Sequence, residues 1–374
     1  MHPDHPAVLL GGLSPAQFMR RHWQRRPLVV RGAWPGVAPP LPHTQLLTLA
    51  ARDDVESRLV RRDGARWHLR RGPLPRRSLP PLRQPGWTVL VQGADLHLER
   101  ARAMLEPFRF VTDARLDDLM ISFATDGGGV GPHLDPYDVF LIQLQGRRRW
   151  RIGPVKDRRL VDEAPLKLLR HFAPTQDLLL EPGDLLYLPP LWGHDGIAVG
   201  TCMTASVGFR APTRQTIVRE VLPLLADALP EAQAWEGLYR DAGSAATTTP
   251  GRVPESLQAF ARTAWRQVLG ERGRLSRALG QWLTEPKPQV WFDPGTPLSG
   301  SGRALHLDRR SRMMYDSVQV YLNGEAYPCA PPDARLLRRL ADRRELAAAD
   351  RARLSKAAGA LVERWAQAGW LHES

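Results

Sequence analysis

The sequence predicts an α+β protein, with a β-rich first half followed by helices and a small C-terminal module that mixes strands and helices. Two observations support this fold class. Between residues 117 and 210, short strand-like runs alternate with turns that contain Gly or Pro, a pattern typical of a sandwich or barrel. After Ala211-Pro212 the pattern changes to helical periodicity rich in Leu, Ala and Arg.

Length and composition limit the number of domains and the class of protein. The chain has 374 residues, enough for two or three domains, and 43% of them are hydrophobic. We expect no membrane helix and no signal peptide, because no apolar run is long enough. With only Cys202 and Cys329, the chain predicts no disulfide framework and fits a reducing cytoplasm.

The net charge of +13 raises the question of a polyanionic partner. Of the 52 basic residues, 48 are Arg and 4 are Lys, and the Arg residues are spread along the whole chain. This distribution fits the coding bias of a GC-rich genome. A nucleic-acid partner is therefore an alternative that the sequence does not favour.

The N-terminal part predicts a helix, a strand and a hairpin. Ser14-Pro15 forms a plausible cap and first helical residue, and Leu28-Val29-Val30 forms a strand. Asp63-Gly64 indicates a hairpin that joins residues 57–60 to 66–69.

The central part predicts a succession of short strands. These are expected at residues 119–124, 139–144, 149–152, 178–180, 185–188 and 203–209. We expect residues 139–144 and 149–152 to face each other across Gly146. Helices are expected within 213–229, 255–284 and 332–368, with a second hairpin at Asn323-Gly324.

A metal site is predicted around His133 and Asp135, which follow a Gly-rich segment. In an extended chain these two side chains point to the same side. A third ligand, His194, follows a Pro-Gly-Asp turn and a strand. Two His and one carboxylate on one side of an octahedron leave positions open for O₂ and a bidentate co-substrate, as in non-haem Fe(II) oxygenases.

Zinc is the competing metal, since catalytic zinc also uses two His and a carboxylate. A His-x-Asp motif alone is weak, because His133 could be a packed histidine and Asp135 a turn carboxylate. The conjunction of the three residues with their Gly and Pro turns favours the metal site.

A co-substrate anchor is predicted on the strand after Gly146. Strand alternation places Arg148 with Trp150 and Ile152 on the apolar side. A buried Arg needs an anionic partner, and a guanidinium binds a carboxylate through two parallel hydrogen bonds. We therefore expect Arg148 to anchor the distal carboxylate of 2-oxoglutarate, with Ser122 adding a hydroxyl. A purely structural Arg148 or Ser122 is the alternative.

Several segments resemble the bacterial ribosomal oxygenases of the JmjC class. They are His22-Trp23-Gln24-Arg25-Arg26-Pro27, Asp117-Asp118-Leu119-Met120, Gly131-Pro132-His133-Leu134-Asp135-Pro136-Tyr137, Gly146-Arg147-Arg148-Arg149-Trp150, Glu181-Pro182-Gly183-Asp184 and Ser206-Val207-Gly208-Phe209-Arg210. The resemblance is dense from about residue 14 to residue 212 and thinner afterwards.

The resemblance implies a three-part architecture. A JmjC oxygenase domain on a double-stranded β-helix (cupin) barrel would span residues 1–212, with its core at about 90–212. A helical dimerisation region would span residues 213–288, and a winged-helix-like domain residues 289–374. A homodimer follows from the same resemblance.

The resemblance also implies the chemistry. Fe(II) would be held by His133, Asp135 and His194, and 2-oxoglutarate by Arg148, with O₂ as the third reactant. A known member of the family hydroxylates C3 of an arginine in ribosomal protein uL16. A guanidinium substrate would suit a carboxylate and an aromatic wall, and of Asp118, Tyr137 and Asp138 we expect Tyr137 and Asp118 to contact it.

Two other functions stay open. The protein could be a JmjC hydroxylase of His or Lys in another protein, or less plausibly a demethylase. It could also be a nucleic-acid-binding regulator whose barrel senses a ligand. Arg335, Arg338, Arg339, Arg343 and Arg344 would suit phosphate, but Leu and Ala alternate with them at packing distances, which favours an interaction or packing role.

Overall fold

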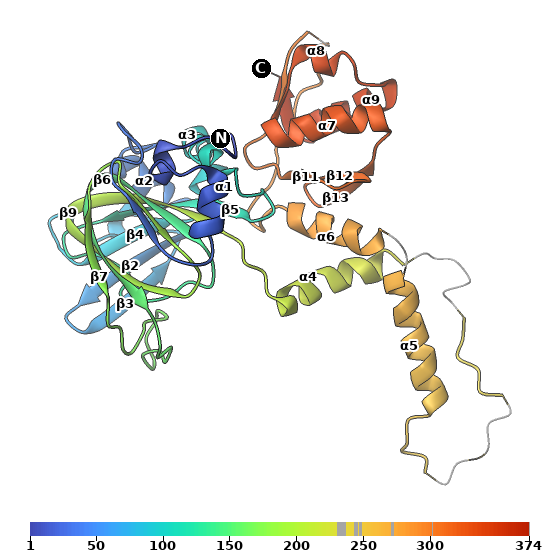
Figure 1. The fold of residues 1–374 in the computed structure, drawn as a ribbon, viewed down its shortest axis with the longest axis horizontal. Helices are drawn as coiled ribbons and strands as arrows, with labels where there is room; N and C mark the ends of the chain where they lie inside the picture. The colour runs from blue at the N-terminus through green and yellow to red at the C-terminus, as the bar shows by residue number, and fades with distance from the viewer. Residues whose placement is uncertain (230–236, 243–245, 247–248, 271–272, 301, 374) are drawn as a thin grey trace. The chain divides into compact units, whose positions relative to one another are not determined.

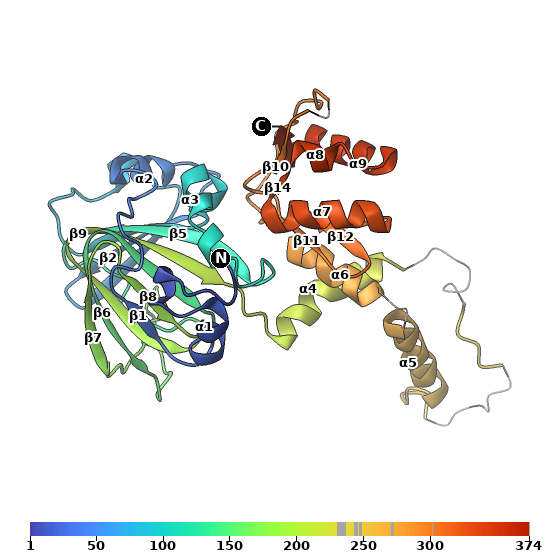
Figure 2. The ribbon, with the colours of Figure 1, turned by 45° about the horizontal axis from the view of Figure 1, so that its top comes forward.

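The computed structural model describes residues 1–229, 237–242, 246, 249–270, 273–300 and 302–373. These residues form two compact units, Met1–Ala211 with Pro288–Val290, and Pro212–Lys287 with Trp291–Ser374. Within the described residues, no helix is both long and apolar enough to cross a membrane. Figures 1 and 2 label the helices and strands of each unit.

The first unit begins with the predicted helix and strand. In α1 (Pro15–Arg21) the Ser14 hydroxyl accepts from the Gln17 N–H at 3.2 Å, and the Gln17 side chain accepts from the Ser14 N–H at 3.0 Å. This reciprocal capping box satisfies two N–H groups at the start of the helix. β1 (Leu28–Val30) then pairs antiparallel with β8 (Leu185–Leu188). Two further helices of this unit are α2 (His43–Leu49) and α3 (Glu99–Ala103).

The predicted hairpin is confirmed, and its strands are longer than expected. β2 (Ser57–Asp63) pairs with β3 (Arg66–Arg71) through the turn at Gly64. β2 also pairs with β4 (Trp87–Val91), which pairs with β5 (Leu116–Ala124). The order of the sheet is β1-β8-β6-β9-β5-β4-β2-β3, with β7 attached to β6, so β3 is an edge strand.

The predicted pair of strands around Gly146 is wrong. Residues 139–154 form one strand, β6 (Val139–Pro154), which pairs with β9 (Trp192–Phe209) on both sides of Gly146. The register shifts near Gly146, whose φ is 63°, and a Cβ there would lie 2.1 Å from the Thr201 carbonyl oxygen. This glycine therefore forms a bulge instead of a hairpin turn, because the partner strand continues past it.

The two strands beside the Pro-Gly-Asp turn both pair with β6. β8 pairs with residues 139–142, and β7 (Gln176–Leu180) pairs with residues 148–152. The long β6 strand thus collects three neighbours, which brings its two halves into one curved sheet (Figure 1).

The sheet separates two apolar clusters, and this separation identifies the face that carries the site. Leu119, Ile121 and Phe123 of β5 pack with side chains of the N-terminal helices in the larger cluster. Trp150 and Ile152 of β6 pack with residues of β7 and β8 in a smaller cluster. Because side chains alternate along a strand, Asp118 and Ser122 of β5 lie on the opposite face from the larger cluster, and this is the inner face.

The second unit starts with the predicted helices. These are α4 (Arg214–Asp227), α5 (Glu255–Gly270) and α6 (Arg274–Thr284). Val221 and Leu225 of α4 pack with Val268 of α5 and Ala278 of α6. Residues 230–236 and 271–272, which the predicted helical region 213–288 includes, lie outside the described residues.

The C-terminal module contains two three-stranded sheets and three helices. One sheet is formed by β11 (Met313–Tyr315), β12 (Gln319–Leu322) and β13 (Glu325–Pro328), and the other by β14 (Glu345–Leu346), β10 (Leu305–Leu307) and β15 (Leu371–Glu373). The helices are α7 (Pro331–Arg343), α8 (Ala348–Arg351) and α9 (Lys356–Gln367). The predicted turn at Asn323-Gly324 is confirmed, since both residues have positive φ.

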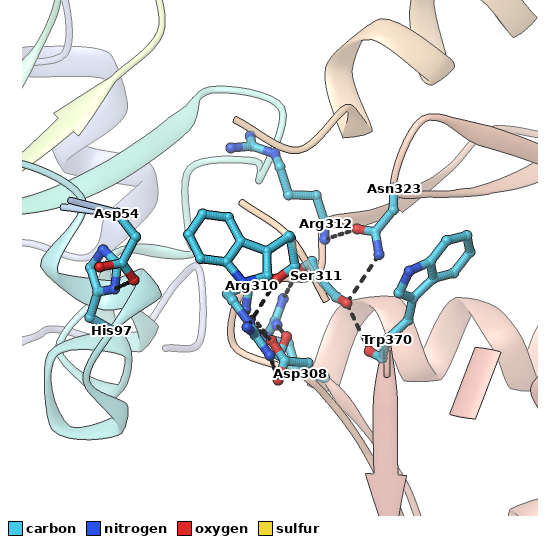
Figure 3. A network of polar contacts seen from close by, with 10 residues as sticks. Asp54, His97, Asp308, Arg310, Ser311, Arg312, Asn323 and Trp370 are labelled. Atoms are coloured by element: carbon cyan, nitrogen blue, oxygen red, sulfur yellow. Dashed lines mark hydrogen bonds and ion pairs between the residues drawn. The ribbon is translucent and has the colours of Figure 1, made fainter. Parts of the chain in front are cut away.

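A polar network stabilises the loop before β11 (Figure 3). The Ser311 hydroxyl donates to the Trp370 carbonyl at 2.8 Å and accepts from the Asn323 amide at 3.2 Å. The Arg312 N–H donates to the Asn323 side-chain oxygen at 2.9 Å, and Asp308 accepts from the Arg310 guanidinium at 2.8 Å. The network connects this loop to the β12–β13 hairpin and to the start of β15.

Candidate metal centre

The structure brings His133, Asp135 and His194 together. The His133 and His194 backbones form a bridge, with N–H to carbonyl distances of 3.0 Å and 2.9 Å. His194 lies near the start of β9, whereas the extended strand expected at residues 133–135 is reduced to this bridge. The metal-binding atoms of His133, Asp135 and His194 all lie within 4.8 Å of one another. No other group of three His, Cys, Asp or Glu side chains in the described residues meets this criterion.

Both imidazoles are oriented by their own backbone. His133 Nδ1 lies 2.9 Å from the Gly131 carbonyl oxygen, and His194 Nδ1 lies 3.0 Å from that of Trp192. Because each carbonyl accepts the Nδ1 proton, each Nε2 keeps its lone pair for a metal. The Nε2 atoms lie 3.8 Å and 3.6 Å from the Asp135 carboxylate, on His133 and His194 respectively.

Burial favours the neutral form of His194, which is the form that binds metal. His194 is 3% exposed, and its desolvation lowers its pKa, with a further lowering by the nearby His133. Two imidazole nitrogens and one carboxylate at these separations fit a divalent ion. Neighbouring ligands about 2.1 Å from an ion would lie roughly 3 Å apart, which a small side-chain movement achieves.

Gly131 allows two apolar side chains to approach the ligand segment. Its φ is 77°, and a Cβ there would lie 2.6 Å from Leu168 and 2.9 Å from Trp67. Trp67 comes from the edge strand β3, and Leu168 comes from the loop before β7. The segment that presents His133 is therefore packed between these two elements.

Arg148 is buried on the inner face, as predicted. It is 5% exposed, while Arg147 and Arg149 beside it are exposed. Its Nη1 donates to the Ser122 hydroxyl at 3.3 Å, but its Nε and Nη2 are buried with no hydrogen-bond partner among the described residues. An unsatisfied buried cation is costly, so this arrangement is suited to a bound carboxylate.

Trp150 connects Arg148 to the ligand triad. Its ring centroid lies 5.9 Å from that of His194 and 5.8 Å from the central guanidinium carbon of Arg148. The cationic group and His194 of the triad are thus both close to one indole ring. A molecule with two anionic ends could contact both.

Tyr137 interacts with the ligand Asp135 and, on the same ring, with Asp118. Burial, together with the carboxylates of Asp135 and Asp118, raises the pKa of the Tyr137 hydroxyl, which places both carboxylates near the ring. Tyr137 remains 38% exposed, whereas Asp118 is 2% exposed. A half-exposed ring above a buried carboxylate can accept a guanidinium.

Comparisons with known proteins agree with this geometry. The JmjC domain family matches residues 103–217. The ribosomal protein uL16 3-hydroxylase of Escherichia coli (strain K12) is 34% identical over 284 residues, which cover 75% of this chain and 74% of that protein. The chain belongs to the JmjC ribosomal oxygenases.

Solved structures of this ribosomal oxygenase family extend the similarity to the whole chain. The X-ray structure of YcfD from Escherichia coli has a TM-score of 0.85 at 30% identity, and it covers 97% of this chain and 98% of that one. A second YcfD structure, in complex with cobalt and 2-oxoglutarate, has a TM-score of 0.80 at 30% identity and the same coverage. The predicted fold class is thus confirmed: a JmjC domain, a helical region and a C-terminal winged helix.

The ROXA-like winged helix family matches residues 267–372. Three of the five Arg residues singled out in this module have partners within it. Arg338 donates to the carbonyls of residues 316 and 317 at 3.0 Å, Arg339 pairs with Asp350 at 2.8 Å, and Arg344 donates to the carbonyl of residue 308 at 2.7 Å. These contacts support the packing role.

Two residues of this ribosomal oxygenase site were missed in the sequence. The Gln92 amide donates to both Asp118 oxygens, at 2.9 Å and 2.7 Å, and its own oxygen accepts from Arg58 at 2.9 Å. Gln92 directly follows β4 and Arg58 lies on β2, so only the sheet order brings them to Asp118. Neither residue belongs to a motif that would have indicated this role.

Asp138, the third acidic or aromatic residue near the ligand segment, has a different role. It is fully buried and accepts from Tyr187 at 2.6 Å, from Gln24 at 3.1 Å and from Arg115 at 3.3 Å. Burial raises the pKa of this carboxyl, against the lowering by these donors. It therefore connects the N-terminal segment to β8 at the start of β6.

Proposed function

We propose that this protein is an Fe(II)- and 2-oxoglutarate-dependent hydroxylase that acts on C3 of an arginine in ribosomal protein uL16. The observation that carries the proposal is the buried, incompletely paired Arg148 beside the triad of His133, Asp135 and His194. A ligand-sensing barrel alone would not need a metal-binding triad. The relatives support the assignment, since one of them is a ribosomal protein uL16 3-hydroxylase and YcfD has been solved in complex with cobalt and 2-oxoglutarate.

The triad would hold the metal through both Nε2 atoms and the Asp135 carboxylate. When bound, iron together with 2-oxoglutarate and O₂ supplies the oxidation that converts a C–H bond to C–OH, with succinate and CO₂ as co-products. The carbonyls of Gly131 and Trp192 keep the two imidazoles in the tautomer that binds metal. Zinc, which the donor set also accommodates, would support no such oxidation.

The other residues bind and orient. Arg148 would hold the distal carboxylate of 2-oxoglutarate through its Nε and Nη2, with Ser122 hydrogen-bonded to the same guanidinium. The Asp118 carboxylate would pair with the substrate guanidinium, and the Tyr137 ring would stack against it. Gln92 fixes the direction of the Asp118 carboxylate by donating to both of its oxygens.

We further propose a division into residues 1–212 for catalysis, 213–288 for dimerisation and 289–374 for the winged helix, in a cytoplasmic homodimer. The support for the dimer is an apolar surface on α5. Trp265 and Leu269, which are one helical turn apart on the same side of α5, are 51% and 57% exposed. Such a surface is unusual on a monomer, and a second copy of the same helix would cover it.

The decisive test is succinate formation from 2-oxoglutarate with Fe(II), O₂ and a uL16 fragment, comparing wild type with His133→Ala. Turnover that requires the fragment and disappears in the variant supports chemistry and substrate together. Mass spectrometry should then locate one added oxygen on an arginine. Turnover of a His- or Lys-containing peptide, but not of the uL16 fragment, would support the alternative hydroxylase. Absence of both turnover and uncoupled decarboxylation in iron-loaded protein would refute the proposal.

A further inference from the structure

The hairpin β2–β3 and the turn after it carry an unusual concentration of positive charge. Eight of the 20 residues 58–77 are Arg, against 48 of 374 in the whole chain, and Asp63 is the only acidic residue among them. A uniform coding bias does not produce such a local excess. The high net charge is therefore concentrated at one edge of the catalytic unit, where β3 ends the sheet.

Most of these charges are not used to hold the protein together. Within the described residues, no ion pair or side-chain hydrogen bond involves the guanidinium groups of six exposed or half-exposed residues. They are Arg61, Arg66, Arg70, Arg71, Arg76 and Arg77. Arg58, which lies opposite Arg71 in the strand pair, donates to Gln92 and is not part of this group.

The arrangement along β3 suits a repeating anion. Arg66, His68 and Arg70 alternate along the strand, all three are exposed, and Arg61 lies opposite His68 on β2. Alternate residues of a strand are about 6.8 Å apart on one face. One row of basic side chains can therefore contact successive charges of an extended chain. Charged residues also protect edge strands from aggregation, but that role requires only one or two of them.

The same edge offers backbone hydrogen bonds. In the described part of the chain, residues 66–71 pair only with β2, so one side of β3 presents N–H and C=O groups that pair with no other strand. A ribose 2′-hydroxyl is both donor and acceptor. It can pair with such groups, whereas deoxyribose cannot.

We propose that the β2–β3 edge, comprising residues 61–77, binds the phosphate backbone of RNA. The positive charge alone does not distinguish RNA from other polyanions. The choice of RNA rests on the proposed function, because a ribosomal protein is assembled with RNA, and on the hydrogen bonds that a 2′-hydroxyl can make. Trp67 of β3 packs against Gly131, whose carbonyl orients His133. The strand that would bind RNA thus also contacts the segment that presents His133, although Trp67 and the row of basic side chains lie on opposite faces of β3. An RNA bound along this edge would bring an RNA-associated substrate to the catalytic unit.

The test is fluorescence anisotropy with a labelled 20-nucleotide RNA and a DNA of the same sequence, using the full chain. The variant R66E/R70E/R77E changes three exposed residues outside the catalytic site. The matched control R20E/R21E/R25E makes the same charge change at exposed residues of and after α1. Thermal unfolding of each variant verifies folding.

We expect the edge variant to bind RNA at least about tenfold more weakly at low salt than the control does. Its plot of log affinity against log salt should be shallower by about 2, since each lost phosphate contact on a single strand contributes about 0.7. Hydroxylation of an isolated substrate peptide should stay unchanged, which separates this result from the proposed function. Equal losses in both variants, no wild-type binding, or equally tight DNA binding would overturn the proposal.

Discussion

The Arg148 guanidinium on β6 reaches Ser122 on β5, where its Nη1 donates to the hydroxyl oxygen at 3.3 Å. The remaining Nε and Nη2 are buried and have no hydrogen-bond partner in the part of the chain that the structure describes. One neutral contact does not compensate a buried positive charge. The Arg148 guanidinium is therefore placed to bind an anion through Nε and Nη2, and its replacement should weaken that binding.

Replacing Arg148 should separate co-substrate binding from folding. In Arg148→Met, we expect 2-oxoglutarate binding to weaken by a factor of about 100 or more, since two charge-assisted hydrogen bonds of about 1.5–3 kcal/mol each are lost. The ligand-free protein should not lose stability, because an unpaired buried charge has been removed. Calorimetric titration and urea unfolding measure the two effects. Arg149→Met, on the solvent side, is the control; a large loss of stability in Arg148→Met alone would indicate a structural role.

The triad should bind a divalent metal only when complete. We expect His133→Ala, Asp135→Ala and His194→Ala each to lower cobalt affinity by more than about 100-fold, since even residues that only orient metal ligands contribute 10–100-fold. Titration followed by the visible absorption of Co(II) gives the affinities. Replacement of His171, which is not part of the triad, should change nothing. A triad variant that retains wild-type affinity would remove that residue from the ligand set.

His194 should make the metal-free protein sensitive to acid. Burial is the main cause that lowers the pKa of His194 below the unfolded value of about 6.5, and the nearby His133 lowers it further. The folded state therefore favours the neutral ring, and this contribution to stability is complete above about pH 6.5 and decreases as pH falls toward the folded pKa. Urea unfolding in chelator at pH 7.5, 6.5 and 5.5 should show a steeper decrease for wild type than for His194→Gln. Parallel curves would contradict the assignment.

The parts of this site that the sequence predicts are those fixed by local pattern. His133, Asp135, Arg148 and Ser122 follow from strand alternation and from the types of residue that metals and carboxylates need. Gly146 was predicted wrongly because a positive φ suits a turn and a bulge equally, and only the partner strand β9 decides between them. Gln92 and Arg58 were missed because their contact with Asp118 depends on strand order.

Asp118 should affect the protein substrate and leave the co-substrate unaffected. In Asp118→Asn, we expect KM for an arginine peptide to rise about tenfold or more, because a charge-assisted pair becomes a neutral hydrogen bond. Decarboxylation of 2-oxoglutarate without peptide should persist. Gln92→Leu should produce a smaller rise, since it removes the donor that orients the carboxylate. Asp177→Asn, on an exposed part of β7, is the matched control; an equal effect on peptide-free decarboxylation would indicate general damage to the barrel.

The apolar face of α5 should control the oligomeric state. Trp265 and Leu269 are about half exposed in the single chain, and burying one such side chain contributes about 1.5–3 kcal/mol. In a two-fold dimer each substitution acts twice, so Trp265→Ser should weaken association by a factor of about 100 or more. Light scattering across a dilution series measures the change. The control is a serine in place of Val8, a residue that is 67% exposed in the other unit.

A wild-type monomer at micromolar concentration would reject the dimer, whereas a dimer unaffected by Trp265→Ser would place the interface elsewhere. Because the triad lies in the first unit, cobalt affinity should be the same in the monomeric variant.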